Sequence, residues 1–258
     1  MAGLCGLGFV TDFLDSLGVG SFATTTTALK LGKVVDDDEI PGTLNVGHAI
    51  PSALESILFL TALNVDWLTL GAMVGAGVLG AWFGTGIVVK WPKRTVQRAM
   101  AVALLVTAGF IVLRQLHSLE VTGGTLGLDG WKLLVAVAAS VVIGALTSLG
   151  IGNYAPTMAL TYMLGMDSKA VFPIMATAAA LILPTAAVQF FRAGRFDRRT
   201  ALGLTLGGLP GVLVAVYVVK ELPKKLLLWV VAAVLVYTAF TLYRASTLTQ
   251  ESRNPDAV

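Results

Sequence analysis

Four titratable side chains in the first 55 residues lie within otherwise apolar segments. Asp12 and Asp15 are three residues apart, so a helix would carry both on one face. His48 titrates near neutral pH, and Glu55 is the one acid between Glu39 and Asp66. Titratable groups inside apolar segments are costly and usually functional. We therefore expect Asp12, Asp15, His48 and Glu55 to couple protons to the activity; the alternative for the two aspartates is a helix cap or an interfacial position.

His48 and Glu55 also belong to a polar helix face. Asn45, His48, Ser52 and Glu55 follow the spacing i, i+3, i+7 and i+10, which puts all four on one side of a helix. Pro51 on the same helix removes a backbone donor and frees a carbonyl for another partner. The face predicts either a functional site or a polar seam between packed helices. A metal site is not expected, because no cysteine or second histidine is close enough.

Two glycine-rich breaks predict helix ends inside the apolar sequence: Gly18-Val19-Gly20-Ser21 and Gly150-Ile151-Gly152-Asn153. A helix that restarts after each break would direct free N–H groups and partial positive charge into the interior, which suits an anion without any lysine or arginine. Ser21 and Asn153 are favoured N-cap residues, and Thr24, Thr25, Thr26, Thr27 and Thr157 add hydroxyl donors. The alternative is that the small residues only permit close helix packing. The expected substrate-binding set is Gly18, Gly20, Ser21, Thr24, Thr25, Asn45, His48, Gly150, Gly152, Asn153 and Thr157.

The composition identifies the elements that must position these residues as membrane helices. Of 258 residues, 56% are apolar and 13% are charged, about half of the roughly 25% usual in soluble proteins. The mean hydropathy is +0.82. This excludes a soluble, disordered or nucleic-acid-binding protein. The net charge of +3 suits loops that orient a membrane protein. Cys5 is the single cysteine, which excludes an internal disulfide.

Uncharged runs predict an all-α, polytopic membrane protein with six full crossings, since one crossing takes about 20 residues. The stretches 3–32 and 133–166 are different, because each is broken by one of the glycine motifs; they could cross the membrane or re-enter it. The predicted crossings are residues 40–64, 67–89, 99–113, 170–191, 200–219 and 226–243.

The two breaks are copies of one motif. Residues 15–25 align with residues 147–157 at an offset of 132, with Ser, Leu, Gly, Gly, Ala and Thr identical. Further prolines, glycines and a Pro-basic-basic motif recur at offsets of 131–133. We therefore expect two homologous halves, residues 1–120 and 131–258, joined by a Gly-rich linker over residues 121–130. Such repeats are typical of secondary transporters.

The distribution of basic residues favours inverted halves. If each broken segment re-enters, each half has three full crossings, and 12 of the 18 lysines and arginines fall on one side. If each broken segment crosses, there are eight spans and the split is 10 to 8. The first arrangement is better, and it predicts that both termini are cytoplasmic.

The repeated motif resembles that of the TauE/SafE family of membrane permeases. The matching segments are residues 14–27, 41–48 and 149–153, within a likeness that covers essentially the whole chain. Ser21 and Asn153 stand where the family motif has its third glycine. The resemblance implies export of sulfite, organosulfonates or related oxyanions across the inner membrane.

The resulting expectation is a secondary transporter that moves a small sulfur-containing oxyanion by alternating access, coupled to protons or to the membrane potential. It would need no cofactor, its partners would be the anion and the lipid bilayer, and a homo-oligomer is left open. A cation transporter or channel using the intramembrane carboxylates is the alternative. An enzyme is not expected: the sequence has no nucleotide-binding loop and no nucleophile motif, and both aspartates lie on one segment.

Overall fold

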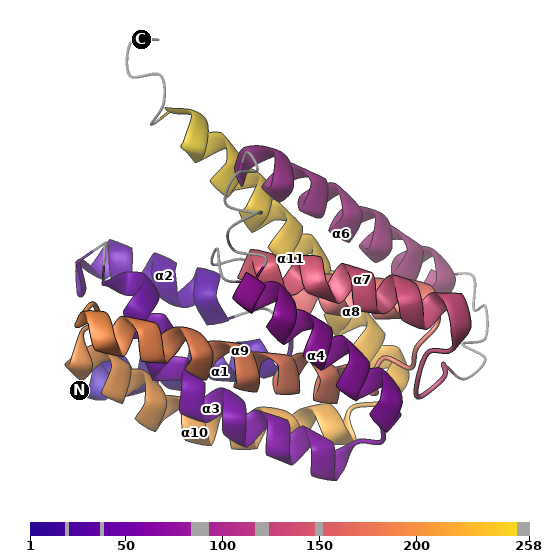
Figure 1. Cartoon of the computed structure of the whole chain (residues 1–258), viewed down its shortest axis with the longest axis horizontal. Coiled ribbons are helices and arrows are strands. Elements are labelled where there is room, and N and C mark those ends of the chain that lie inside the picture. The colour runs from indigo at the N-terminus through magenta and orange to yellow at the C-terminus, as the bar shows by residue number, and fades with distance from the viewer. Residues whose placement is uncertain (19–20, 37–38, 84–92, 117–123, 148–151, 252–258) are drawn as a thin grey trace.

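The computed structural model describes residues 1–18, 21–36, 39–83, 93–116, 124–147 and 152–251. Within them the chain is almost entirely helical, as the sequence predicts, and forms no strand beyond an isolated bridge between Thr125 and Met166. The ten described helices form an elongated bundle (Figure 1). They are α1 (Ala2–Ser16), α2 (Ser21–Gly32), α3 (Ile40–Ala62), α4 (Trp67–Phe83), α6 (Lys93–Leu116), α7 (Gly130–Thr147), α8 (Tyr154–Leu164), α9 (Val171–Ala193), α10 (Arg198–Glu221) and α11 (Lys224–Glu251).

Four of the described helices are long and apolar enough to cross a membrane. Three of them, Val171–Ala193, Arg198–Glu221 and Lys225–Arg244, coincide with predicted crossings. The fourth, Gly130–Thr147, was expected as one arm of a broken stretch, yet it has 18 residues by itself. Trp67–Phe83 and Met100–Leu113 are apolar but shorter. α3 has the length, with 23 residues, but it includes Asn45, His48 and Glu55 and is not among the four.

One end of the bundle is formed by the start of α3 and the turn between α9 and α10. The backbone N–H of Asp197 donates to the hydroxyl of Thr43 at 2.9 Å, and the carbonyl of Arg195 lies against Gly42. Gly42 is required there, because a Cβ atom would collide with that carbonyl. The start of α3 therefore lies beside the end of α9 and the start of α10.

At the opposite end of the bundle, residues 124–129 lie between two turns, the one that joins α3 to α4 and the one that joins α8 to α9. The backbone N–H of Asp66 donates to the carbonyl of Leu126 at 3.0 Å, and that of Asp167 donates to the carbonyl of Thr125 at 2.9 Å. These bonds place the end of α3 beside the start of α9. The two helices are therefore antiparallel, and α4 and α10 start at opposite ends of the bundle.

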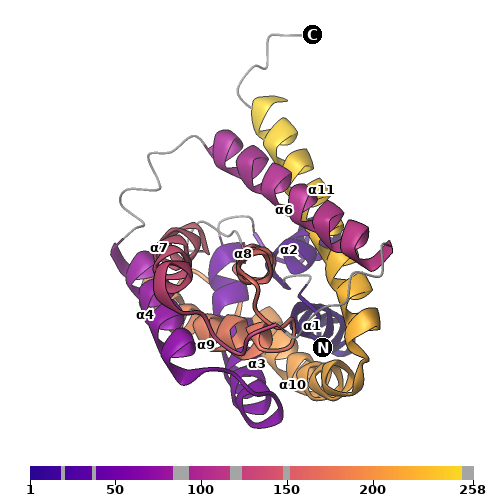
Figure 2. The same ribbon diagram turned by 90° about the vertical axis from the view of Figure 1, so that its right-hand side faces the viewer.

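Helices from the first part of the chain pack mainly against helices from the second part. α1 packs mainly against α10, and α7 mainly against α4, while α6 and α11 pair at the edge of the bundle (Figure 2). Gly207 on α10 lies directly against the carbonyl of Cys5 on α1, and Gly144 on α7 against that of Gly77 on α4. Small residues allow such close approach between membrane helices.

The helices recur along the chain at nearly constant spacing. α3 and α9 begin at Ile40 and Val171, α4 and α10 at Trp67 and Arg198, and α6 and α11 at Lys93 and Lys224, each 131 residues apart (171 − 40, 198 − 67, 224 − 93). The start of α8 follows that of α2 by 133 residues (154 − 21). The division into halves at residues 121–130 stays a prediction.

Pro51 lies inside α3, as expected, and its effect on the backbone is visible. Proline has no N–H to donate to the carbonyl four residues earlier, which is that of Gly47. That carbonyl instead accepts from the hydroxyl of Thr205 on α10 at 2.7 Å. The proline thus creates a bond between two helices at the cost of one within α3.

Candidate functional site

Both glycine breaks interrupt helices, as the sequence predicts. α1 ends at Ser16, and Gly18 follows with φ +97°, a conformation that glycine adopts without strain; α2 starts at Ser21. α7 ends at Thr147, and α8 starts at Tyr154 with Asn153 as its N-cap residue. Gly20 and Gly150, also expected in the site, lie outside the described residues.

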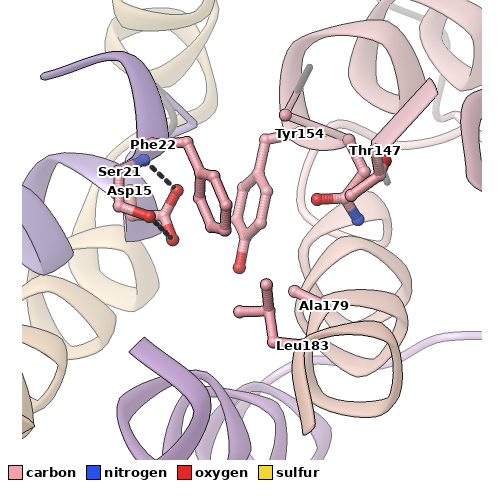
Figure 3. A pocket seen from close by; sticks show the side chains of 9 residues that line it. Asp15, Ser21, Phe22, Thr147, Tyr154, Ala179 and Leu183 are labelled. Carbon is pink, nitrogen blue, oxygen red and sulfur yellow. Dashed lines mark hydrogen bonds between the residues drawn. The ribbon is translucent and has the colours of Figure 1, made fainter. Parts of the chain in front are cut away.

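The two breaks, far apart in sequence, line one small cavity (Figure 3). Its volume is about 20 Å³, enough for roughly one water molecule and too little for an oxyanion with several heavy atoms. The site is therefore closed in this conformation. No lysine or arginine is among the described lining residues, which are Asp15, Ser21, Phe22, Thr147, Gly152, Asn153, Tyr154, Ala179 and Leu183.

Asp15 occupies the amino end of α2. One carboxylate oxygen accepts from the backbone N–H of Ser21 at 2.7 Å, and the other accepts from the Ser21 hydroxyl at 3.1 Å. Asp15 is only 4% exposed. A carboxylate at a helix amino end is stabilised by the free N–H groups and by the helix dipole. Asp15 thus caps α2, one of the positions that the sequence allowed for it, and its part in proton coupling stays a prediction.

Asp12 is bonded to His48, which lies on a different helix. His48 Nδ1 donates to Asp12 Oδ1 at 2.8 Å, and the hydroxyl of Thr25 lies 3.3 Å from His48 Nε2. All three side chains are buried, and Asp12 Oδ2 packs against Gly208 with no hydrogen-bond partner. The imidazole therefore joins α1, α2 and α3 in one chain of polar contacts, and it can accept or release a proton within that chain.

Glu55 is bonded to Tyr154, a residue that sequence reasoning did not single out. The tyrosine hydroxyl donates to Glu55 Oε2 at 2.9 Å, whereas Oε1 has no hydrogen-bond partner. Ser52, one helical turn earlier, is also buried with an unpartnered hydroxyl. The repeat could have pointed to it. Tyr154 aligns with Phe22, and the two side chains differ by the tyrosine hydroxyl, which is the group that bonds to Glu55.

The α8 end of the cavity has no carboxylate corresponding to Asp15. The equivalent residue is Thr147, whose hydroxyl donates to the carbonyl of Ile143 at 2.8 Å. Asn153 does not cap α8 with its side chain; its amide donates to the carbonyl of Met175 on α9 at 3.1 Å. The amino end of α8 therefore has no side chain bonded to it among the described residues.

The other expected site residues are only partly brought together. Thr24 donates to the carbonyl of Ser21 within α2, at 2.9 Å. Thr157 lines a second, smaller cavity of about 10 Å³ between α4, α7, α8 and α9, together with Asn153. Asn45 is not part of the buried set: its amide donates to the carbonyl of Pro41 on the same helix at 2.8 Å.

Comparison with known proteins gives one finding. The family model described as "Sulfite exporter TauE/SafE" matches residues 4–242. No curated protein and no solved structure matches the chain.

Proposed function

Because the chain belongs to the TauE/SafE sulfite exporter family, we propose that it carries a small sulfur-containing oxyanion, of the sulfite or organosulfonate type, across the cytoplasmic membrane. The family is one of membrane transporters and not of enzymes. With its apolar helices, the chain is accordingly a multi-pass membrane protein.

The observation that carries this proposal is the cavity between the two breaks. The amino ends of α2 and α8 both border it, and none of the lining residues that the structure describes is basic. Helix amino ends bind oxyanions through N–H groups and the helix dipole without burying a cationic side chain. Transporters of several folds use half-helix amino ends for anionic substrate groups in this way.

The transport step we propose is a rocking of two inverted halves around this cavity. Equivalent helices run in opposite directions, as α3 and α9 do, which supports the inversion. The small cavity corresponds to a closed intermediate, and substrate would enter when one half tilts away from the other. In this scheme both termini lie on the cytoplasmic side.

Proton coupling is the driving force we propose. It would use Asp12, Asp15, His48 and Glu55, which are all buried and close enough to interact electrostatically. A cation transporter would need several carboxylates placed together around its ion. Asp15 has both oxygens bonded to Ser21, and the described residues contain no group of three or more His, Cys, Asp or Glu that could hold a metal ion, which favours the proton.

The test is transport by the purified protein in sealed vesicles loaded with sulfite. Efflux should exceed that from protein-free vesicles and should be inhibited by thiosulfate or methanesulfonate but not by sodium, potassium or magnesium salts of an inert anion. Inhibition by cations alone, with no sulfite flux, would contradict the proposal and support the cation transporter.

A further inference from the structure

The two helix amino ends at the cavity differ in one respect. The end of α2 already holds an anion, the carboxylate of Asp15, whose two oxygens accept from Ser21 N–H and Oγ. The end of α8 has Thr147 in the equivalent place, and the Thr147 hydroxyl is bonded within its own helix. An oxyanion approaching α2 would meet a carboxylate in the position that it would itself occupy.

We propose that Asp15 is a tethered anion that holds the amino end of α2 until it is protonated, and that a substrate anion then replaces it. This inference rests on the proposed function and deepens it, since it names the residue and the site through which a proton and an anion bind together. The proton neutralises the Asp15 carboxylate, the neutral carboxyl leaves Ser21, and the N–H and hydroxyl of Ser21 bind the substrate.

Charge balance prevents the ionised Asp15 carboxylate and a substrate anion from occupying the amino end of α2 together. The cavity holds about one water molecule, and no lysine or arginine is among its described lining residues. The nearby imidazole of His48 also acts on Asp15, but it is already bonded to the Asp12 carboxylate, so no further cation is at hand for a second negative charge. An unpaired charge in a buried site is strongly unfavourable. With a singly charged substrate such as hydrogensulfite or a sulfonate, the amino end of α2 holds one negative charge before and after substrate binding, because the proton neutralises the Asp15 carboxylate.

The titratable neighbours of Asp15 have partners of their own. From α1, Asp12 faces it and is bonded to His48 of α3; also from α3, Glu55 faces it and is bonded to Tyr154 of α8. His48 itself also acts on Asp15. Of the described side chains, α9 contributes Ala179 and Leu183 to the cavity, and α7 contributes Thr147. Among these acids, Asp15 alone is bonded to a helix amino end, so it is the carboxyl that an anion can replace.

The experiment measures the affinity of purified protein for sulfite as a function of pH, in wild type and in Asp15→Asn. The asparagine keeps the size of the side chain but has no charge to exchange. In wild type, sulfite binds only when Asp15 takes up a proton, so the dissociation constant should rise by up to about tenfold per pH unit at alkaline pH. The variant lacks this component, so it should bind sulfite at least tenfold more tightly than wild type at alkaline pH and equally at acidic pH. Protonation of sulfite itself cancels in the ratio of the two constants.

The matched control is Asp197→Asn. Asp197 also caps a helix, accepting from the N–H of Thr200 at 2.7 Å, but it lies in the turn before α10. This variant should keep the wild-type pH profile. If Asp15→Asn fails to fold, Asp15→Thr introduces the residue found at the equivalent position 147 and should give the same result.

Each outcome decides between the two proposals. An Asp15 variant with the wild-type pH profile would overturn the exchange, leave Asp15 as a helix cap, and leave the anion transporter standing. Failure of the wild-type protein to bind sulfite at any pH would overturn both. Loss of sulfite binding in a folded Asp15→Asn protein would also overturn the exchange, because the carboxylate would then assist the anion instead of competing with it.

Discussion

The hydroxyl of Tyr154 lies 2.9 Å from Oε2 of Glu55 and links α8 to α3 across the sequence midpoint. Both side chains are buried, and the other carboxylate oxygen has no hydrogen-bond partner. The bond therefore holds one oxygen of the Glu55 carboxyl group, and it joins the two predicted halves beside the cavity.

Removing that donor should destabilise the protein. Tyr154→Phe takes away the hydroxyl and recreates the ring present at Phe22, so packing is largely kept. Leaving a buried acceptor without a partner costs about 1–3 kcal/mol. We expect a lower midpoint of thermal unfolding in detergent, and a smaller further loss when Glu55→Gln is added, since coupled residues are not additive.

Tyr217→Phe is the control, because Tyr217 is exposed on α10. It should change stability by less than about 0.5 kcal/mol. Equal effects of the two substitutions would show that the bond to Glu55 contributes nothing to stability.

Close packing between α1 and α10 can be tested at Gly207. A Cβ atom at this position would collide with the carbonyl of Cys5. Because this carbonyl belongs to the backbone of α1, it cannot move aside as the end of a flexible side chain could. Gly207→Ala should therefore separate the two helices and destabilise the protein by about 1–3 kcal/mol, measured by unfolding in detergent.

The repeat supplies the control for this substitution. Gly75 is the equivalent residue at an offset of 132, and a Cβ atom there meets nothing within 4 Å. Gly75→Ala should be neutral or stabilising by up to about 1 kcal/mol, since alanine favours the helix. A destabilisation by Gly75→Ala as large as that by Gly207→Ala would contradict the packing described for α1.

Asp66 gives a prediction about pH. Its carboxylate accepts from the N–H and the hydroxyl of Thr69, both at 2.8 Å, and these bonds lower its pKa. A lowered pKa in the folded state contributes stability above the unfolded pKa, which is lost as the pH falls through the folded value. The difference in unfolding midpoint between wild type and Asp66→Asn should therefore shrink below about pH 4.

Asp129→Asn, at an exposed residue near the start of α7, serves as the control for Asp66. It should leave the pH dependence unchanged. If Asp66→Asn and wild type differ equally at neutral and at acidic pH, the two bonds from Thr69 do not select the ionised carboxylate.

Much of the fold follows from local sequence patterns. The positions where α2 and α8 start were predictable from the glycine pairs, because glycine weakens a helix wherever it occurs. The burial of His48, Ser52 and Glu55 on one face followed from their spacing. Asn45 shares that spacing but lies near the start of α3, where its amide bonds to Pro41, so periodicity alone did not show how deep a residue lies.

The partners of the site residues were not predictable in the same way. Asp15 fills the end of α2, Asn153 turns its amide to Met175, and Glu55 meets Tyr154 on α8. Each of these contacts depends on how helices pack or how the chain turns between them, which a single helix's pattern does not contain. The break motif located the site, and the packing decided which groups remain available for a ligand.

The most direct test of an anion site at the amino end of α8 is sulfite binding by Asn153→Asp and Asn153→Ala. Both variants lose the bond to Met175, but only the aspartate adds negative charge to the cavity wall. At about 100 times its dissociation constant, sulfite should stabilise the wild type and Asn153→Ala by roughly 2.7 kcal/mol in thermal unfolding, and it should not stabilise Asn153→Asp. Equal stabilisation of Asn153→Asp and the wild type by sulfite would contradict an anion site between the two breaks.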